Sequence, residues 1–239
     1  MRSILLTALA CWATGIVAVA TTADSSQIAA IFPPAGIAMA AALAVGPRAL
    51  VGVYLGILAM MLSSGPVIST GVATAFATGV LAGAITAGQA ALGATLVRRL
   101  LPREAPPPSE PRRIISLLLL AGPVTCAAST IASMAVLLAS GHLPAERLVA
   151  TGYRVWVADT LGVAIFLPAS LAIVARPRDQ WRPLLLTAAL PLLLAGVVIA
   201  TAMTRQESAE REIAQVEFMR KSTEAARSFL EQIEEAQLI

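Results

Sequence analysis

Long apolar runs with almost no charges inside them constrain this chain more than any other feature. Hydrophobic residues make up 57% of its 239 residues and charged residues 13%, whereas soluble domains usually carry about 25% charged residues. The charges of residues 3–203 fall mainly in short gaps between apolar runs, each long enough to cross the ~30 Å hydrocarbon layer as a helix. The sequence therefore predicts an all-α fold, a polytopic transmembrane helix bundle in a lipid bilayer.

We expect seven spans, at residues 3–20, 28–45, 49–67, 71–97, 114–139, 147–175 and 183–203. The fourth would reach about 40 Å as a helix, so it must tilt, bend or protrude. Gly122-Pro123 in the fifth span and Pro168 in the sixth predict kinks.

The arginines indicate the orientation of the bundle. The basic gaps alternate with poor ones: the basic positions are Arg2, Arg48, five in 98–113 and three in 176–182, whereas Arg147 beside the 140–146 loop is balanced by Glu146. Because basic loops stay in the cytoplasm, seven spans place the N-terminus inside and the C-terminus outside. The excess positive charge therefore orients helices, and no nucleic-acid partner is expected.

Residues 204–239 differ in character from the rest of the chain. They carry five basic and eight acidic groups and contain no glycine or proline, which predicts one charged amphipathic helix. Its apolar face is formed by Met219, Ser222, Ala226, Phe229, Ile233 and Ala236, flanked by Phe218 and Leu230. This face lacks a partner, and Leu238-Ile239 gives no helix stop signal, so the full-length protein is expected to continue. The predicted domains are a membrane bundle at 1–203 and an extracytoplasmic helix at 204–239.

The N-terminus admits two interpretations. Residues 4–20 could be a secretory signal cleaved after Ala18-Val19-Ala20. The run is longer than a usual signal and more apolar runs follow it, so an uncleaved first span is favoured. Cys11 and Cys126 both fall inside apolar runs, which is typical of small buried hydrophobes and not of a metal site or a disulfide framework.

Asp159 is the main candidate for a functional group. An ionisable residue within a span is costly and is a functional candidate by default. Asp159 either holds neighbouring helices together through hydrogen bonds or senses a ligand, a proton or an ion. Trp156, three residues earlier, shares its helix face. Arg154, five residues earlier, does not, so direct pairing is not expected.

Three further candidates are Pro33, Pro34 and Gln89. The two prolines either start a helix or leave helix-end groups for a polar partner. Gln89 is expected to join helices and less to bind a ligand. Gly79 and Gly83 have the spacing that lets helices approach closely, within the bundle or in a homodimer. The lone His142 supports no metal or catalytic site, and neither an enzyme nor a cofactor is predicted.

Three segments resemble the first membrane-associated sensor (MASE) family of bacteria. They are 31–40 (Ile-Phe-Pro-Pro-Ala-Gly-Ile-Ala-Met-Ala), 92–100 (Leu-Gly-Ala-Thr-Leu-Val-Arg-Arg-Leu) and 156–163 (Trp-Val-Ala-Asp-Thr-Leu-Gly-Val), in the family's order. The chain departs from the family pattern at Phe32 for Trp, Gln89 for Glu, Thr86 for Asn and Ala158 for Gly, which puts the ligand preference in question.

The resemblance implies an inner-membrane input domain of a histidine kinase, diguanylate cyclase or cyclic-di-GMP phosphodiesterase, responding to an unknown small molecule or to membrane state. The tail at 206–239 is similar to the first helix of an extracellular CHASE sensor domain. A small-solute transporter using Asp159, Gln89 and the two kinks as a midplane site is the alternative from another class. An assembly factor that only binds other membrane proteins is a third.

Overall fold

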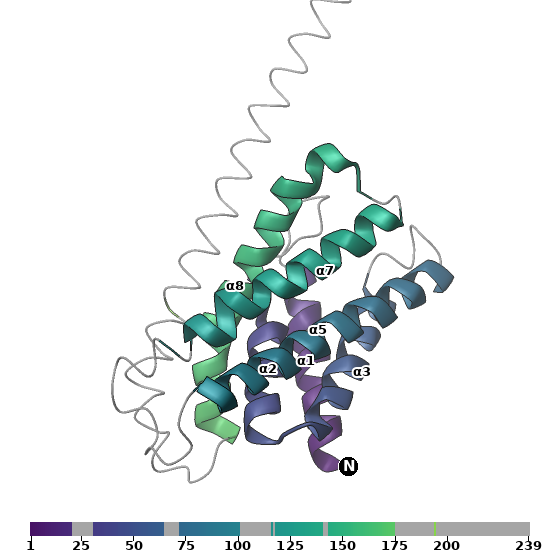
Figure 1. Cartoon of the computed structure of the whole chain (residues 1–239). Coiled ribbons are helices and arrows are strands. Elements are labelled where there is room, and N and C mark those ends of the chain that lie inside the picture. Colours follow the sequence, from purple (N-terminus) through teal and green to yellow (C-terminus); the bar gives the residue numbers. More distant parts are fainter. Residues whose placement is uncertain are drawn as a thin grey trace, which may run out of the picture. The chain divides into compact units, whose positions relative to one another are not determined.

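A computed structural model of the chain describes residues 1–20, 31–64, 72–100, 116, 118–140, 143–174 and 194. All of them belong to one compact unit, Met1–Val198. Its helices are α1 (Arg2–Ala20), α2 (Pro33–Ala44), α3 (Arg48–Ser63), α5 (Val72–Leu100), α7 (Thr125–Ala139) and α8 (Leu148–Val174). A π-helical turn, η1 (Leu120–Val124), precedes α7, and a 3-10 turn, η2 (Ala145–Arg147), precedes α8. The described residues contain helices and no strand, which confirms the all-α prediction for them (Figure 1).

Four helical segments are long and apolar enough to cross a membrane. They are Arg2–Ala20, Val72–Leu100, Leu120–Ala139 and Ala145–Val174. The second and third predicted spans are shorter than expected, because α2 has 12 residues and α3 has 16. Within the second predicted span, helix α2 begins at the two prolines. Apart from Leu194, the seventh predicted span and the tail at 204–239 lie outside the described residues.

The short helix α2 lies at the centre of the bundle. Eight of its 12 residues are buried, and it contacts α1, α3, α5 and α8. Most of those buried residues are alanine, glycine or proline, whose small side chains let neighbouring backbones approach closely. Met39 fills the space between α2 and α5 opposite Gly93.

Glycines set the close packing of the outer helices as well. Gly52 and Gly56 of α3 lie against the backbone of α1. Gly79 of α5 meets Leu58 of α3, and Gly83 meets Tyr54. The glycine pair at 79 and 83 therefore packs inside the bundle, which is the first of the two interpretations of its spacing.

The predicted kinks have different outcomes. At Gly122-Pro123 the helix widens into the π-helical turn η1, because proline cannot donate the backbone hydrogen bond of a regular turn. At Pro168 helix α8 runs on without interruption to Val174.

The connection predicted at 98–113 begins later than expected. Arg98 and Arg99 lie in the last turn of α5, which ends at Leu100. The guanidinium of Arg98 donates to the carbonyl oxygens of Ala42 (2.6 Å) and Leu43 (3.4 Å). These carbonyls belong to the last turn of α2 and its end, so Arg98 caps this short helix.

Candidate functional site

Asp159 lies near the middle of α8, eleven residues after the helix begins at Leu148. Its carboxyl group lies close to the side chain of Ser129 on α7. Ser129 is itself buried, at 6% exposure. Among the described residues no cation pairs with this carboxyl group. A carboxyl group so placed must be stabilised by neutral polar neighbours.

Cys126 of α7 connects Asp159 to α5. The Gln89 amide donates a hydrogen bond to the Cys126 sulfur across α5 and α7, with an Nε2–Sγ distance of 3.0 Å. Both residues are buried, and the thiol lies close enough to Asp159 to interact with it electrostatically. Gln89 therefore joins two helices, as expected. Cys126 is more than a small hydrophobe, because it belongs to a polar group of side chains inside the bundle.

Threonine hydroxyls complete these surroundings. Thr125 donates to the carbonyl of Ala121 (2.6 Å) at the π-helical turn. Thr160, the residue after Asp159, lies beside the Cys126 thiol. The hydroxyls of Thr130 and Thr160 are buried and have no hydrogen-bond partner of good geometry among the described residues. We call Gln89, Cys126, Ser129, Thr130, Asp159 and Thr160 the polar cluster.

The start of α2 is fixed beside this cluster. The Phe32 N–H donates to the carbonyl of Ala158, immediately before Asp159, at 3.0 Å. Gly36 of α2 and Gly162 of α8 make this approach possible, because a β-carbon at either position would collide with the backbone of the other segment. The first and third of the sequence segments singled out above therefore meet here, and the second meets the first where Gly93 faces Met39.

Pro33 and Pro34 are the first two residues of α2, so the interpretation as a helix start is confirmed. Neither has an N–H group, and the Ala35 N–H donates to the Phe32 carbonyl (3.2 Å). The first three helical positions therefore leave no free backbone donor, which is how a helix can begin in a buried place. At these positions the backbone has no free N–H group that could donate a hydrogen bond to a polar ligand.

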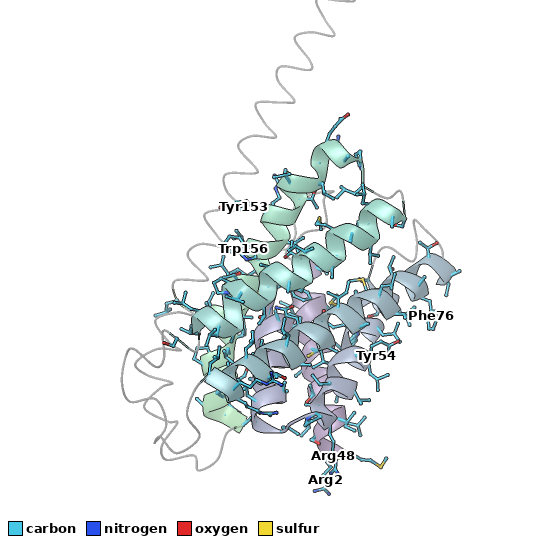
Figure 2. All side chains as sticks on the ribbon, in the orientation of Figure 1. Arg2, Arg48, Tyr54, Phe76, Tyr153 and Trp156 are labelled. Atoms are coloured by element: carbon cyan, nitrogen blue, oxygen red, sulfur yellow. The ribbon has the colours of Figure 1, made fainter. Side chains whose placement is uncertain are left out.

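Trp156 shares α8 with Asp159, but its indole has another partner. The Nε1–H donates to the carbonyl of Pro123 in the π-helical turn, at 3.0 Å. Tyr153 lies beside it on α8, with ring centroids 6.1 Å apart (Figure 2). Trp156 thus holds α8 against the π-helical turn that precedes α7.

Sequence reasoning singled out Asp159 and Gln89 but missed Ser129, Thr130 and Thr160. A signal existed, because Cys126, Ser129 and Thr130 are small polar residues spaced three and four apart in an apolar run. It could not show that this face of α7 meets Asp159, since that depends on how α7 and α8 pack.

Comparison with known families agrees with the resemblance noted above. A family model described as MASE1 matches residues 1–211. The chain belongs to the MASE1 family. MASE1 is a membrane sensor domain found in bacterial signalling proteins. Together with the four long apolar helices, the match makes this a membrane protein.

MASE1 is sensory and not catalytic, which is consistent with the prediction that this chain is no enzyme. The match does not favour the transporter alternative. Neither the curated proteins nor the solved structures give a match to the chain.

Proposed function

We propose that this MASE1 bundle is the input domain of a bacterial inner-membrane signalling protein of the histidine kinase, diguanylate cyclase or phosphodiesterase type. It detects a small ligand or a membrane state at the polar cluster and passes the change to an output domain outside the chain. The single observation that carries this proposal is the placement of Asp159, without a described cation, among neutral polar side chains of α5 and α7. Ionisable and polar side chains inside a membrane bundle cost folding free energy, and residues of this kind are typical of functional sites.

Helix α2 is the element best placed to transmit a change. Its start is joined to the residue before Asp159 through the Phe32 N–H, and its end is held by Arg98. A movement of α8 at Asp159 therefore shifts α2 and reaches the end of α5. Two alternative packings of such tightly fitted helices, with different affinities for the ligand, would form the switch.

The proposed topology keeps the N-terminus in the cytoplasm and the C-terminus outside. Arg2 and Arg48 lie at the same end of the bundle (Figure 2), as the alternation of basic gaps requires. In this topology residues 204–239 begin an extracytoplasmic region of the CHASE type. A second copy of the chain is a further candidate partner in this proposal.

The test uses the full-length protein in its native membrane. Asp159→Asn keeps the shape of the side chain and removes its charge and its exchangeable proton, while Gln89→Leu removes the hydrogen bond to Cys126. Kinase or cyclic-di-GMP output should change several-fold in both variants. Glu146→Gln alters an exposed acid in η2 and is the matched control. Wild-type output from Asp159→Asn at wild-type abundance would contradict a sensing role for the cluster.

A further inference from the structure

Arginine side chains gather at one end of the bundle, which is formed by the starts of α1 and α3 and by the last turns of α2 and α5. They are Arg2, Arg48, Arg98 and Arg99, and all four are exposed. The starts of α1 and α3 lie side by side, since Gly52 faces the Ile4 carbonyl. Figure 2 accordingly shows Arg2 and Arg48 at the same end. Arg98 joins them because it contacts the end of α2, from which the chain turns into α3.

The described acids lie elsewhere in the bundle. There are two of them, Asp159 within α8 and Glu146 in η2 just before α8 begins. Helices α2 and α8 run in the same direction, because the residue before α2 bonds to Ala158 and Gly36 lies against residues 162–167. The start of α8 is therefore at the opposite end to the end of α2. Within the described part of the chain, the arginine end holds four positive charges and no negative one.

Arg98 is held in place by the backbone and still has donors to spare. Its Nη2 atom donates to the carbonyls of Ala42 (2.6 Å) and Leu43 (3.4 Å). A guanidinium group has five N–H donors, and those on Nε and Nη1 have no partner among the described residues. Because the two carbonyls already fix this side chain, it loses less conformational entropy on binding an anion than a free surface arginine does.

The turn between α2 and α3 leaves space beside these cations. Val45 and Pro47 are exposed, and Gly46 between them has a φ of 92°. A β-carbon built on Gly46 meets no atom within 4 Å. Arg48 follows this turn directly, and the carbonyls that hold Arg98 precede it by two and three residues. Open space therefore adjoins both arginines.

Apolar side chains continue from Arg48 along the outside of α3. Val51 and Leu55 follow it by three and seven residues, so the three share one helix face. Both are exposed, at 51% and 46%, whereas Ala49 and Val53 are fully buried. A lipid whose phosphate group lies at Arg48 can lay an acyl chain along this face, and a soluble phosphate cannot use it. A cation followed by an exposed apolar stripe thus favours a lipid as the ligand.

We infer that this end of the bundle binds an anionic phospholipid, whose phosphate group lies between Arg48 and Arg98 in the leaflet that this end faces. Guanidinium groups form charge-assisted hydrogen bonds with phosphate oxygens. Arg2 and Arg99 add electrostatic attraction, as clustered basic residues do for anionic headgroups at a membrane surface. A zwitterionic lipid is disfavoured, because its ammonium group would enter a site with four positive charges. This site is separate from the polar cluster and does not rest on its sensing function.

Native mass spectrometry of the full chain in detergent, titrated with phosphatidylglycerol, tests this inference. The wild type should bind phosphatidylglycerol several-fold more tightly than phosphatidylcholine. Arg48→Gln and Arg98→Gln should each weaken phosphatidylglycerol binding about fivefold, the effect of one basic side chain at an anionic membrane surface. The matched control is Arg154→Gln, which removes the same charge from an exposed position near the start of α8 and should bind as the wild type does.

Arg48→Gln keeps the test decisive where Arg98→Gln does not fold, because Arg48 takes no part in capping α2. Equal binding of the two lipids, wild-type binding by Arg48→Gln, or an equal loss in Arg154→Gln would overturn the inference. Displacement of the lipid by a small excess of free glycerol phosphate would also overturn it, since the site would then be one for soluble phosphates. None of these results depends on signalling output, so each leaves the proposed function of the polar cluster to its own test.

Discussion

Gly162 of α8 lies directly against the carbonyl group of Phe32, with no room for a β-carbon between them. Gly36 makes the reciprocal contact from α2, against the Gly162 carbonyl. These two glycines bring the start of α2 within hydrogen-bonding distance of the segment that carries Asp159. The obstacle at both positions is backbone, which cannot turn aside as a long side chain can.

Gly162→Ala should therefore destabilise the bundle by about 1–3 kcal/mol, as overpacking does in well-filled interiors. The matched control is Gly88→Ala, because a β-carbon at Gly88 meets nothing within 4 Å and alanine favours a helix over glycine by up to about 1 kcal/mol. The melting temperatures of both variants are measured as the temperature at which heating removes the monodisperse gel-filtration peak. Equal melting temperatures for the two variants would mean that the α2–α8 contact is not as close as described.

Trp156→Phe should leave the Pro123 carbonyl without its donor. The bond runs from α8 to the π-helical turn before α7, and an interhelical hydrogen bond in a membrane contributes about 0.6 kcal/mol on average and up to about 1.7. Trp12→Phe is the control, since that indole donates to the exposed Ser63 hydroxyl at 2.8 Å and water or lipid headgroups can replace it. A larger fall in melting temperature for Trp12→Phe would contradict the prediction.

Arg98→Met should loosen the end of α2. The two carbonyls that Arg98 caps would lose a charged donor, and a hydrogen bond to a charged group contributes about 1.5–3 kcal/mol, reduced here because the guanidinium is partly exposed to solvent. Arg99→Met removes an equal charge from the next, exposed position of α5 and should have little effect. Hydrogen exchange at the amides of residues 41–46 is the readout, and it should quicken only in Arg98→Met.

The proposed orientation predicts labelling from opposite sides of the membrane. In a background where Cys11 and Cys126 stay unlabelled because they are buried, Arg48→Cys should react with an impermeant maleimide only in inverted vesicles. Glu146→Cys, at the start of α8, should react only in right-side-out spheroplasts. Labelling of both positions from one side would refute the alternation of the helices between them.

The features that depend on local hydropathy could be predicted from the sequence. The helices α1, α5 and α8 agree with expected spans to within a few residues at each end, because an apolar run of this length is stable in lipid whatever its neighbours are. Asp159 stood out for the same reason, since the cost of a carboxyl group in an apolar run is a property of that run. Helix α2 was harder to predict, because two prolines inside an apolar run shift its start.

The partners of these residues were decided by the tertiary structure. Which face of α7 meets Asp159, which carbonyl holds Phe32 and which helix end Arg98 caps all depend on the rotation and offset of whole helices. Those are fixed where glycine lets two backbones touch, at Gly36 and Gly162. Hydropathy is summed along a single helix and carries no information on how that helix is rotated against its neighbours. The amino-acid sequence therefore determined only that this chain resides in a membrane and carries Asp159 within an apolar helix, where a carboxyl group is costly. The packing of α2, α7 and α8 alone decided which hydroxyls surround that acid.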